Sequence, residues 1–308
     1  MKLTQLINRF ATVPIVGVDF DPVSVRVVEL APKDDHVAVR RAAAALVNGL
    51  GAVDAFKQLV AQLDVRATRA AVSLAAPQII VKPFAFPSMP KKELAKAVQL
   101  EAEQEIMSGH GHEMTVDWHL LPSRTNALRG LYAVVPKTTV AARLATIRQA
   151  GLQPVVVDIA GLALWNGFWT LVGSQEASPK TWMLLHVGRR WTNVVIVTSP
   201  DTLLLTRDVQ IGSDLVAAGR MDELISEIQD SLGYARAQGG LRNLDAVALS
   251  GEGSLQPVMD KLSALVPCPV TAWNPLDHLP WEAPTPLPDS AQGSSFAIAV
   301  GLALRQPS

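Results

Sequence analysis

The chain has 308 residues, of which 49% are hydrophobic, enough apolar material for one large core or two linked cores. Its formal net charge is −1, so no overall field attracts nucleic acid or an anionic membrane, and we expect neither as a direct partner. The single cysteine, Cys268, excludes an internal disulfide and is consistent with a reducing compartment.

The sequence shows no pattern of a secretion signal or a membrane span. Residues 1–12 contain too short an apolar run for a signal peptide. The most apolar stretch, residues 155–173, is interrupted by Asp158 and Asn166, whereas a bilayer span needs roughly 20 mostly apolar residues. We therefore predict a buried strand followed by a helix there, and a soluble protein that reaches a membrane only through a partner.

In the first half of the chain, patterns typical of strands and helices alternate. Residues 16–30 predict a strand, a tight turn and a second strand rich in β-branched residues. The elements expected next are a strand at 36–46, a helix at 52–63, two strands within 70–86, a helix from about 90 to 107, strands at 114–121 and 130–136, a helix at 138–151, and a strand and helix within 152–164.

The second half begins after a linker at residues 173–180 and repeats the opening pattern. Residues 182–197 again predict a strand, a turn and a strand, which indicates two related α/β lobes. The elements expected after them are a strand at 201–209, one helix near 214–236, a strand, glycine turn and helix within 245–262, a proline-rich loop at 274–293, and an apolar helix at 294–305.

Three turns between these elements have the composition of anion-binding loops: DFDPVSVR (19–26), HVGRRWTN (186–193) and LSGEGS (249–254). A tight turn of small residues offers several backbone N–H groups to a phosphate, and a glycine turn before a helix adds the positive end of the helix dipole. Each turn alone is a weak signal, because most glycine turns only redirect the chain. Their order and spacing together make a stronger one.

The chain resembles the PilM family of type IV pilus assembly proteins, actin-like relatives of the cell-division protein FtsA. The matching stretches are GVDFDPVSVRVVEL, MPKKELAKAVQLEAEQEI followed by EMTVDWHLL, GLQPVVVDIAGLAL, LLLTRDVQIGSDL, VALSGEGSLQP, NPLDHL and AIAVGLALR, in that order. The resemblance implies an α/β, actin-like (ribonuclease H-like) two-lobe fold with a small α+β subdomain inserted in the first lobe. Its expected parts are a first lobe at 1–175 with the insertion at about 40–150, a second lobe at 181–290, and a C-terminal helix at 291–308 that returns to the first lobe.

The resemblance also implies the residues of a nucleotide cleft. The cofactor-binding positions that match the family are Asp19, Ser24, Arg26, Gly188, Gly212, Gly251 and Gly253, and the metal-binding positions are Asp19 and Asp158. If the site is retained, it would hold ATP and Mg²⁺. No catalytic residue is assigned.

Departures from the family pattern weaken this cleft. Asp21 replaces a glycine or serine, Pro22 replaces a small polar residue and removes a backbone donor, and His186 replaces an acid. A carboxylate at about 4 Å from a phosphate, with an effective dielectric near 20, costs on the order of 4 kcal/mol, or about 1000-fold in affinity. We therefore expect nucleotide binding to be weak or lost and no cofactor to be bound.

The function implied is that of a cytoplasmic scaffold in a type IV pilus or competence pilus machine. The expected partners are the cytoplasmic N-terminal tail of a bitopic, PilN-like inner-membrane protein, lying in a groove between the first lobe and the small subdomain, and other pilus assembly proteins. Such a protein is peripheral to the inner membrane. The alternatives are a working Mg-ATP-dependent actin-like ATPase, and an MshI-like protein of the MSHA pilus or a cytoplasmic type II secretion component.

Overall fold

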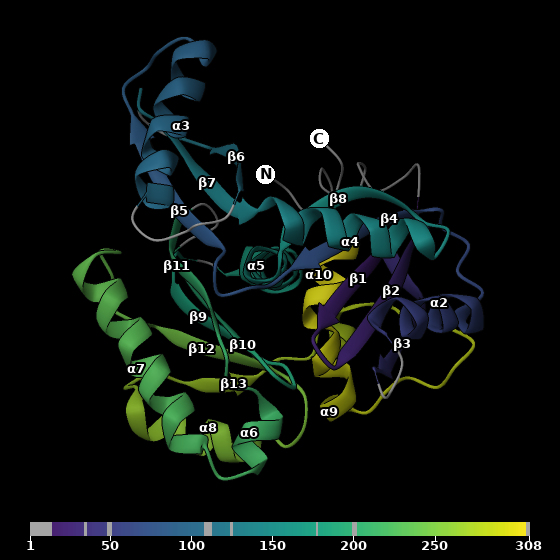
Figure 1. The fold of residues 1–308 in the computed structure, drawn as a ribbon. Helices are drawn as coiled ribbons and strands as arrows, with labels where there is room; N and C mark the ends of the chain where they lie inside the picture. The colour runs from purple at the N-terminus through teal and green to yellow at the C-terminus, as the bar shows by residue number, and fades with distance from the viewer. Residues whose placement is uncertain are drawn as a thin grey trace.

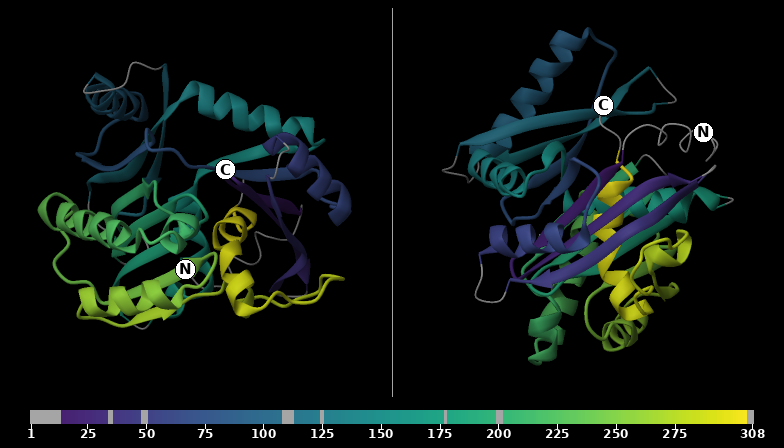
Figure 2. Two further views of the ribbon diagram at one scale, coloured as in Figure 1. Left: turned by 60° about the horizontal axis from the view of Figure 1, so that its bottom comes forward. Right: turned by 90° about the vertical axis from the view of Figure 1, so that its right-hand side faces the viewer.

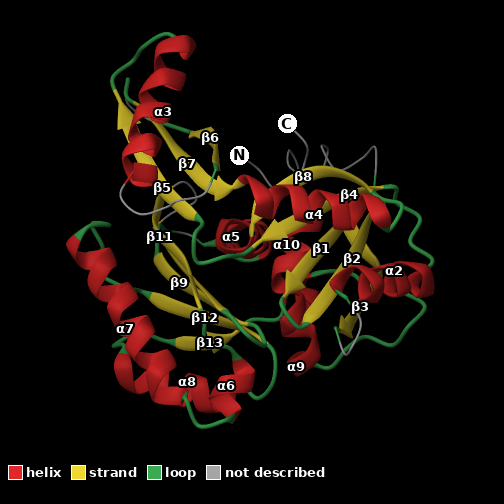
Figure 3. Ribbon diagram, viewed as in Figure 1, coloured by secondary structure: helices red, strands yellow, loops and turns green. Residues whose placement is uncertain are grey.

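The computed structural model describes residues 14–33, 36–47, 51–107, 113–123, 126–176, 178–198 and 202–305. They form two five-stranded sheets, a three-stranded sheet and the helices that cover them (Figure 1). Coloured by secondary structure, the chain shows two mixed α/β bodies joined by central helices, with a smaller body projecting from one end (Figure 3). None of the described helices is long and apolar enough to cross a lipid bilayer.

The first sheet, in the order β3-β2-β1-β4-β8, forms the first lobe. β1 and β2 are the predicted hairpin, with Asp21 opposite Ser24, so that its turn contains only two residues. β4 and β8 extend the sheet in parallel. Helices α2 and α4 cover its outer face, where Phe56 and Ile147 are fully buried. These elements are β1 (Ile15–Asp21), β2 (Ser24–Lys33), β3 (His36–Leu46), α2 (Ala52–Leu63), β4 (Arg69–Leu74), α4 (Lys137–Gln149) and β8 (Gln153–Ile159).

The second sheet, in the order β11-β10-β9-β12-β13, forms the second lobe and repeats the plan of the first. Its hairpin of β9 and β10 matches that of β1 and β2, and helices α7 and α8 cover the outer face through Leu224, Ile228 and Leu262. The elements are β9 (Thr181–Val187), β10 (Thr192–Thr198), β11 (Thr202–Val209), α6 (Ser213–Ala217), α7 (Met221–Ala237), β12 (Ala246–Gly251), α8 (Gln256–Leu265) and β13 (Val270–Ala272).

The single helix predicted near 214–236 is wrong, because the segment contains two helices, α6 and α7. Gly219, which lies between them, has a φ of 90°, a left-handed conformation that ends the first helix. The sequence pattern predicted one continuous helix because apolar residues continue on both sides of Gly219.

The third sheet, in the order β5-β7-β6, is a separate small subdomain with helix α3 packed on it. Its core contains Phe84, Leu94, Val98 and Tyr132. The subdomain projects from the first lobe beside the edge of the second, where β11 contacts β5 (Figure 1). Its elements are β5 (Ile80–Phe86), α3 (Lys91–Met107), β6 (Met114–Leu121) and β7 (Leu128–Pro136). The insertion was expected at about 40–150, whereas β3, α2, β4 and α4 pack with the first sheet.

Two apolar helices, α5 (Ala160–Leu171) and α10 (Ala297–Ala303), lie between the inner faces of the two large sheets (Figure 2). One continuous core joins them to both sheets. The helices touch closely, since Asn166 donates from Nδ2 to the carbonyl oxygen of Gly301 at 2.8 Å. The short helices that complete the fold are η1 (Gly173–Gln175), η2 (Pro275–His278), α9 (Ser290–Gly293) and η3 (Ser294–Phe296).

The contact between α5 and α10 leaves no room for a side chain at Gly301. A Cβ there would lie 1.9 Å from the carbonyl oxygen of Ala163. We expect Gly301→Ala to lower the free energy of unfolding by about 3 kcal/mol, because the two helices must separate. Urea denaturation measures this change.

Gly233 on α7 is the matched control, since a Cβ there meets nothing within 4 Å. Gly233→Ala is expected to raise stability by about 0.5–1 kcal/mol, the usual gain inside a helix. Equal stability of Gly301→Ala and the wild type would refute the close helix crossing.

Candidate functional site

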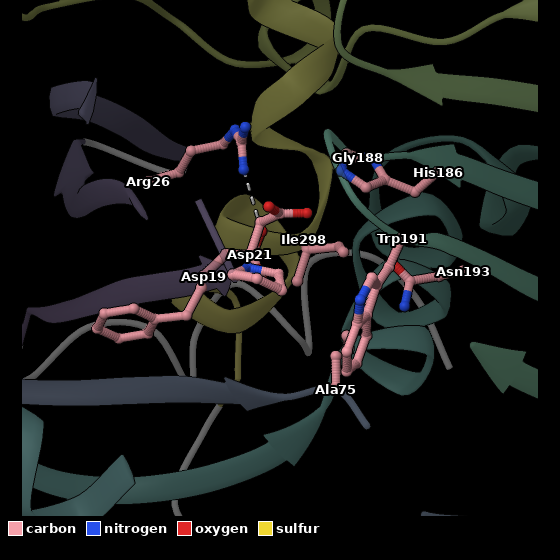
Figure 4. A pocket seen from close by; sticks show the side chains of 12 residues that line it. Asp19, Asp21, Arg26, Ala75, His186, Gly188, Trp191, Asn193 and Ile298 are labelled. Carbon is pink, nitrogen blue, oxygen red and sulfur yellow. Dashed lines mark ion pairs between the residues drawn. The ribbon is translucent and has the colours of Figure 1, made fainter. Parts of the chain in front are cut away.

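The candidate site lies where the two hairpins and the turn between β12 and α8 meet (Figure 4). The cavity between them is lined by Asp19, Phe20, Asp21, Pro22, Arg26, Ala75, Ala160, His186, Gly188, Trp191, Asn193 and Ile298. Its volume is about 20 Å³. That is room for about one water molecule, whereas pockets for small-molecule ligands usually measure roughly 300–1,000 Å³.

A buried guanidinium occupies the centre of this site. Arg26, on β2, is only 1% exposed, and its Nη1 lies 3.6 Å from Oδ2 of Asp19 (Figure 4). Its Nη2 donates to Oγ of Ser24 at 3.2 Å and forms an ion pair with Oε1 of Glu252, in the turn after β12. The pair therefore joins a strand of the first lobe to a loop of the second. Burial of Glu252 raises the pKa of its carboxyl, and the attraction of Arg26 offsets only part of that rise.

The two residues predicted to bind a metal are each held by other groups. Oδ1 of Asp19 accepts a hydrogen bond from Oγ of Ser73 at 2.7 Å, and burial raises the pKa of Asp19 despite Arg26. Asp158 lies opposite Ser73 in the sheet, but its Oδ2 accepts from Nε of Arg305 at 2.5 Å. Across the described residues, no three histidine, cysteine or acidic side chains gather in a metal-binding group.

Asp21, the residue expected to repel a phosphate, bridges the two hairpins. Its Oδ1 accepts from the backbone N–H of Val23 at 3.1 Å, which closes its own turn. Its Oδ2 accepts from the backbone N–H of Arg190 at 3.1 Å, in the turn of the second lobe. A Cβ on Gly188 would come within 3.1 Å of this carboxylate oxygen, so the carboxylate packs directly against that turn.

His186 is neutral in the folded protein. It is 2% exposed, and burial, followed by the nearby positive charge of Arg26, lowers its pKa to about 3. Its Nδ1 lies 3.0 Å from Oγ of Ser250, which in turn donates to the carbonyl oxygen of Leu185 at 3.3 Å. With the serine proton used in this way, Nδ1 carries the imidazole hydrogen and donates it to Ser250.

A third polar contact between the lobes lies near the cavity. Oδ2 of Asp208, on β11, accepts from the backbone N–H of Ala76 in the loop after β4 at 3.0 Å. Its Oδ1 accepts from Nδ2 of Asn193 at 2.6 Å, and burial raises the pKa of Asp208 to about 6. Sequence reasoning missed the roles of Asp208 and Glu252, although both lie inside stretches that carried the family resemblance.

The structure brings together only some of the predicted cofactor-binding residues. Arg26 donates a hydrogen bond to Ser24 and forms an ion pair with Asp19, and Gly188 lines the same cavity. The other three glycines shape the chain. Gly251 and Gly253 have φ values of 136° and 76°, which favour glycine, and a Cβ on Gly212 would lie 2.4 Å from the carbonyl group of Arg189. Their role toward a nucleotide stays a prediction.

ATP and Mg²⁺ do not fit the site as its residues are arranged. The cavity is about 20 Å³, Asp21 occupies a backbone donor of the second turn, and Glu252 occupies the guanidinium of Arg26. Asp158 is engaged by Arg305. The charged residues of the cleft thus pair with one another, although Nε and Nη1 of Arg26 have no hydrogen-bond partner among the described residues.

The burial of neutral His186 predicts a pH-dependent contribution to stability. Because the pKa is about 6.5 in the unfolded chain and lower in the fold, this contribution is present above pH 6.5 and is lost as the pH falls toward 3. Between pH 7 and pH 5, the free energy of unfolding of the wild type should fall by about 2 kcal/mol more than that of His186→Asn. Asparagine keeps a polar group close to the position that Nδ1 of His186 occupies. Urea titrations of both proteins at each pH measure this difference, and one that did not vary with pH would contradict it.

Comparison with known proteins extends these observations. Residues 17–219 match the family profile described as type IV pilus assembly protein PilM. A structure titled "PilM-PilN type IV pilus biogenesis complex" is similar with a TM-score of 0.75 and 23% sequence identity, over 94% of this chain and 97% of the other. A Bacteroides thetaiotaomicron protein with an actin-like ATPase fold is similar with a TM-score of 0.51 and 12% identity, over 88% of this chain and 93% of its own.

No curated protein sequence matches the chain. The solved structures confirm the actin-like two-lobe fold expected from the sequence, and the family profile covers both hairpins, the small subdomain and the helices α4 to α6. The chain therefore belongs to the PilM family of type IV pilus assembly proteins.

Proposed function

We propose that this protein is a cytoplasmic scaffold of a type IV pilus or competence pilus machine and works without nucleotide. Its partner is the cytoplasmic N-terminal tail of a bitopic, PilN-like inner-membrane protein, which places it at the inner membrane. Family membership supports the pilus role, and a similar structure is titled as a PilM–PilN complex. The observation that carries the loss of nucleotide is the filled cleft, in which Asp21 accepts the backbone N–H of Arg190 and Glu252 pairs with Nη2 of Arg26.

The edge of the first sheet offers a docking place for such a tail. β8 is the outermost strand of the described sheet, and the segment that joins the small subdomain to the first lobe packs near it. Val157 on β8 is 38% exposed, and its neighbours Val155 and Val156 are half-buried. An extended tail that pairs with a strand edge gains backbone hydrogen bonds, and its apolar side chains cover such residues.

Nucleotide independence predicts that millimolar Mg-ATP leaves the melting temperature unchanged. A ligand raises the melting temperature only if it binds the folded state, and the cleft leaves no space for a triphosphate. Differential scanning fluorimetry of the whole chain measures this. The competing ATPase function predicts a rise that Asp19→Ala abolishes, and that result would overturn nucleotide independence.

Tail binding at β8 predicts that Val157→Asp weakens the complex by at least about 10-fold, because a charge replaces an apolar contact at the interface. The affinity of the chain for a synthetic peptide is measured by calorimetry. The peptide has the sequence of the N-terminal tail of the bitopic membrane protein that is encoded next to this chain in the native host. Leu287→Asp is the matched control, since Leu287 is also exposed, at 50%, and lies in the proline-rich loop. Equal weakening by both variants, or no binding by the wild type, would count against this docking place.

A further inference from the structure

Two carboxylates of the cleft contact groups that are suited to hold an anion. Oδ2 of Asp21 accepts the backbone N–H of Arg190 in the tight turn between β9 and β10. Glu252 pairs with the buried guanidinium of Arg26. Backbone N–H groups of tight turns and arginine guanidinium groups are the donors with which proteins commonly bind phosphates and carboxylates.

Both contacts cross from one lobe to the other, in opposite senses. Asp21 belongs to the first hairpin and reaches the second, whereas Glu252 belongs to the second lobe and reaches Arg26 on the first. Arg26 is 1% exposed, and Glu252 has a side chain only 17% exposed. Water screens this pair poorly, and separating the lobes would take the carboxylate of Glu252 away from the guanidinium of Arg26. The contacts therefore oppose opening of the cleft.

The donors of Arg26 are not exhausted by its present partners. Within the described residues, its Nε and Nη1 have no hydrogen-bond partner, although Nη1 lies 3.6 Å from Asp19. The guanidinium also lines the cavity of about 20 Å³. A nearly fully buried cation that keeps donors without partners beside a cavity retains the capacity to bind an anion.

The charges around the cavity oppose the entry of an external anion. Asp19, Asp21 and Glu252 supply three carboxylates, and Arg26 is the buried cation among them. The nearby cations face other groups: Arg189 pairs with Asp214 at 3.0 Å, and the guanidinium of Arg143 lies over the ring of Phe20, 4.1 Å from its centroid. His186 adds no charge, because its pKa is about 3.

We propose that Asp21 and Glu252 are built-in substitutes for an anionic ligand and hold the two lobes closed in the resting protein. This proposal rests on the proposed loss of nucleotide binding. In it, the carboxylates of Asp21 and Glu252 take the place of the nucleotide's phosphates. A ligand that bridges two lobes closes a cleft only while it is bound. Here the chain supplies the bridge, so closure is permanent, and a latent phosphate site lies beneath the two carboxylates.

The test removes both carboxylates and supplies inorganic tripolyphosphate, a phosphate chain without a base or sugar. In Asp21→Gly/Glu252→Ala, the N–H of Arg190 loses its acceptor, Arg26 loses the carboxylate of Glu252, and the space fills with solvent. We expect a lower melting temperature than wild type, restored by tripolyphosphate. The affinity of this double variant for tripolyphosphate, measured by calorimetry, should exceed that of the wild type by at least about 100-fold, because the two repelling charges are gone and the space that their side chains filled is open.

Asp21→Asn/Glu252→Gln is the matched control, since it removes the same charges but keeps the same volume. It should bind tripolyphosphate no better than about 10-fold above wild type, because the space stays filled. A folded Asp21→Gly/Glu252→Ala protein that keeps wild-type stability and binds no tripolyphosphate would overturn the proposal.

A second measurement decides the question if the double variant does not fold. Amide hydrogen exchange at Arg190 should be slow in wild type and markedly faster in the single variant Asp21→Gly, because the carboxylate of Asp21 is the acceptor of that N–H. Unchanged exchange would overturn the bridge between the lobes. This outcome is distinct from a failure of the proposed function. The proposed nucleotide independence is tested separately, by Mg-ATP binding to the wild type.

Discussion

The buried guanidinium of Arg26 is the constraint on which the cleft depends. A charge removed from water is costly unless it is paired, and truncating one partner of such a pair typically costs about 3–5 kcal/mol. Arg26 meets this requirement with Asp19 on its own hairpin and Glu252 from the other lobe. The second lobe therefore supplies a carboxylate that the buried cation of the first lobe needs, and the charged groups in the cleft pair with one another.

The central helices give this pairing a rigid support. α5 and α10 lie between the two sheets in one continuous core, and the carbonyl oxygen of Gly301 accepts from Asn166 across their contact. Polar contacts on two further pairs of segments, from Asp21 to Arg190 and from Ala76 to Asp208, act in parallel with Arg26. Such rigidity suits the proposed scaffold role, because a surface that is already ordered loses less conformational entropy when a partner binds.

Much of the fold was predictable from local patterns in the sequence. The two hairpins, the helix α2 and the strand–helix units around β8 and β12 follow from apolar periodicity and turn residues, and the family resemblance gave the two-lobe arrangement. Periodicity does not tell which sheet a strand joins, so β3 and β4 were counted with the insertion although they pair with β2 and β1.

The chemistry of the site was predictable only in part. Asp21 and His186 were recognised as departures because they replace residues of a family pattern. The contacts that decide the site, from Asp21 to Arg190 and from Arg26 to Glu252, join segments far apart in the chain. No local pattern encodes such pairs. The sequence therefore indicated that an anion would be repelled, whereas the structure shows that the repelling group is itself bound.

The most direct test of the central claim is the distance between the lobes in solution. Spin labels on cysteines introduced at Lys57 on α2 and at Asp222 on α7, both exposed positions, report this distance by pulsed electron paramagnetic resonance. Cys268 is first replaced by serine, so that only the two introduced positions are labelled. The account predicts a single narrow distance distribution in the ligand-free protein, unchanged by millimolar Mg-ATP. A broad or two-peaked distribution that Mg-ATP narrows would contradict it.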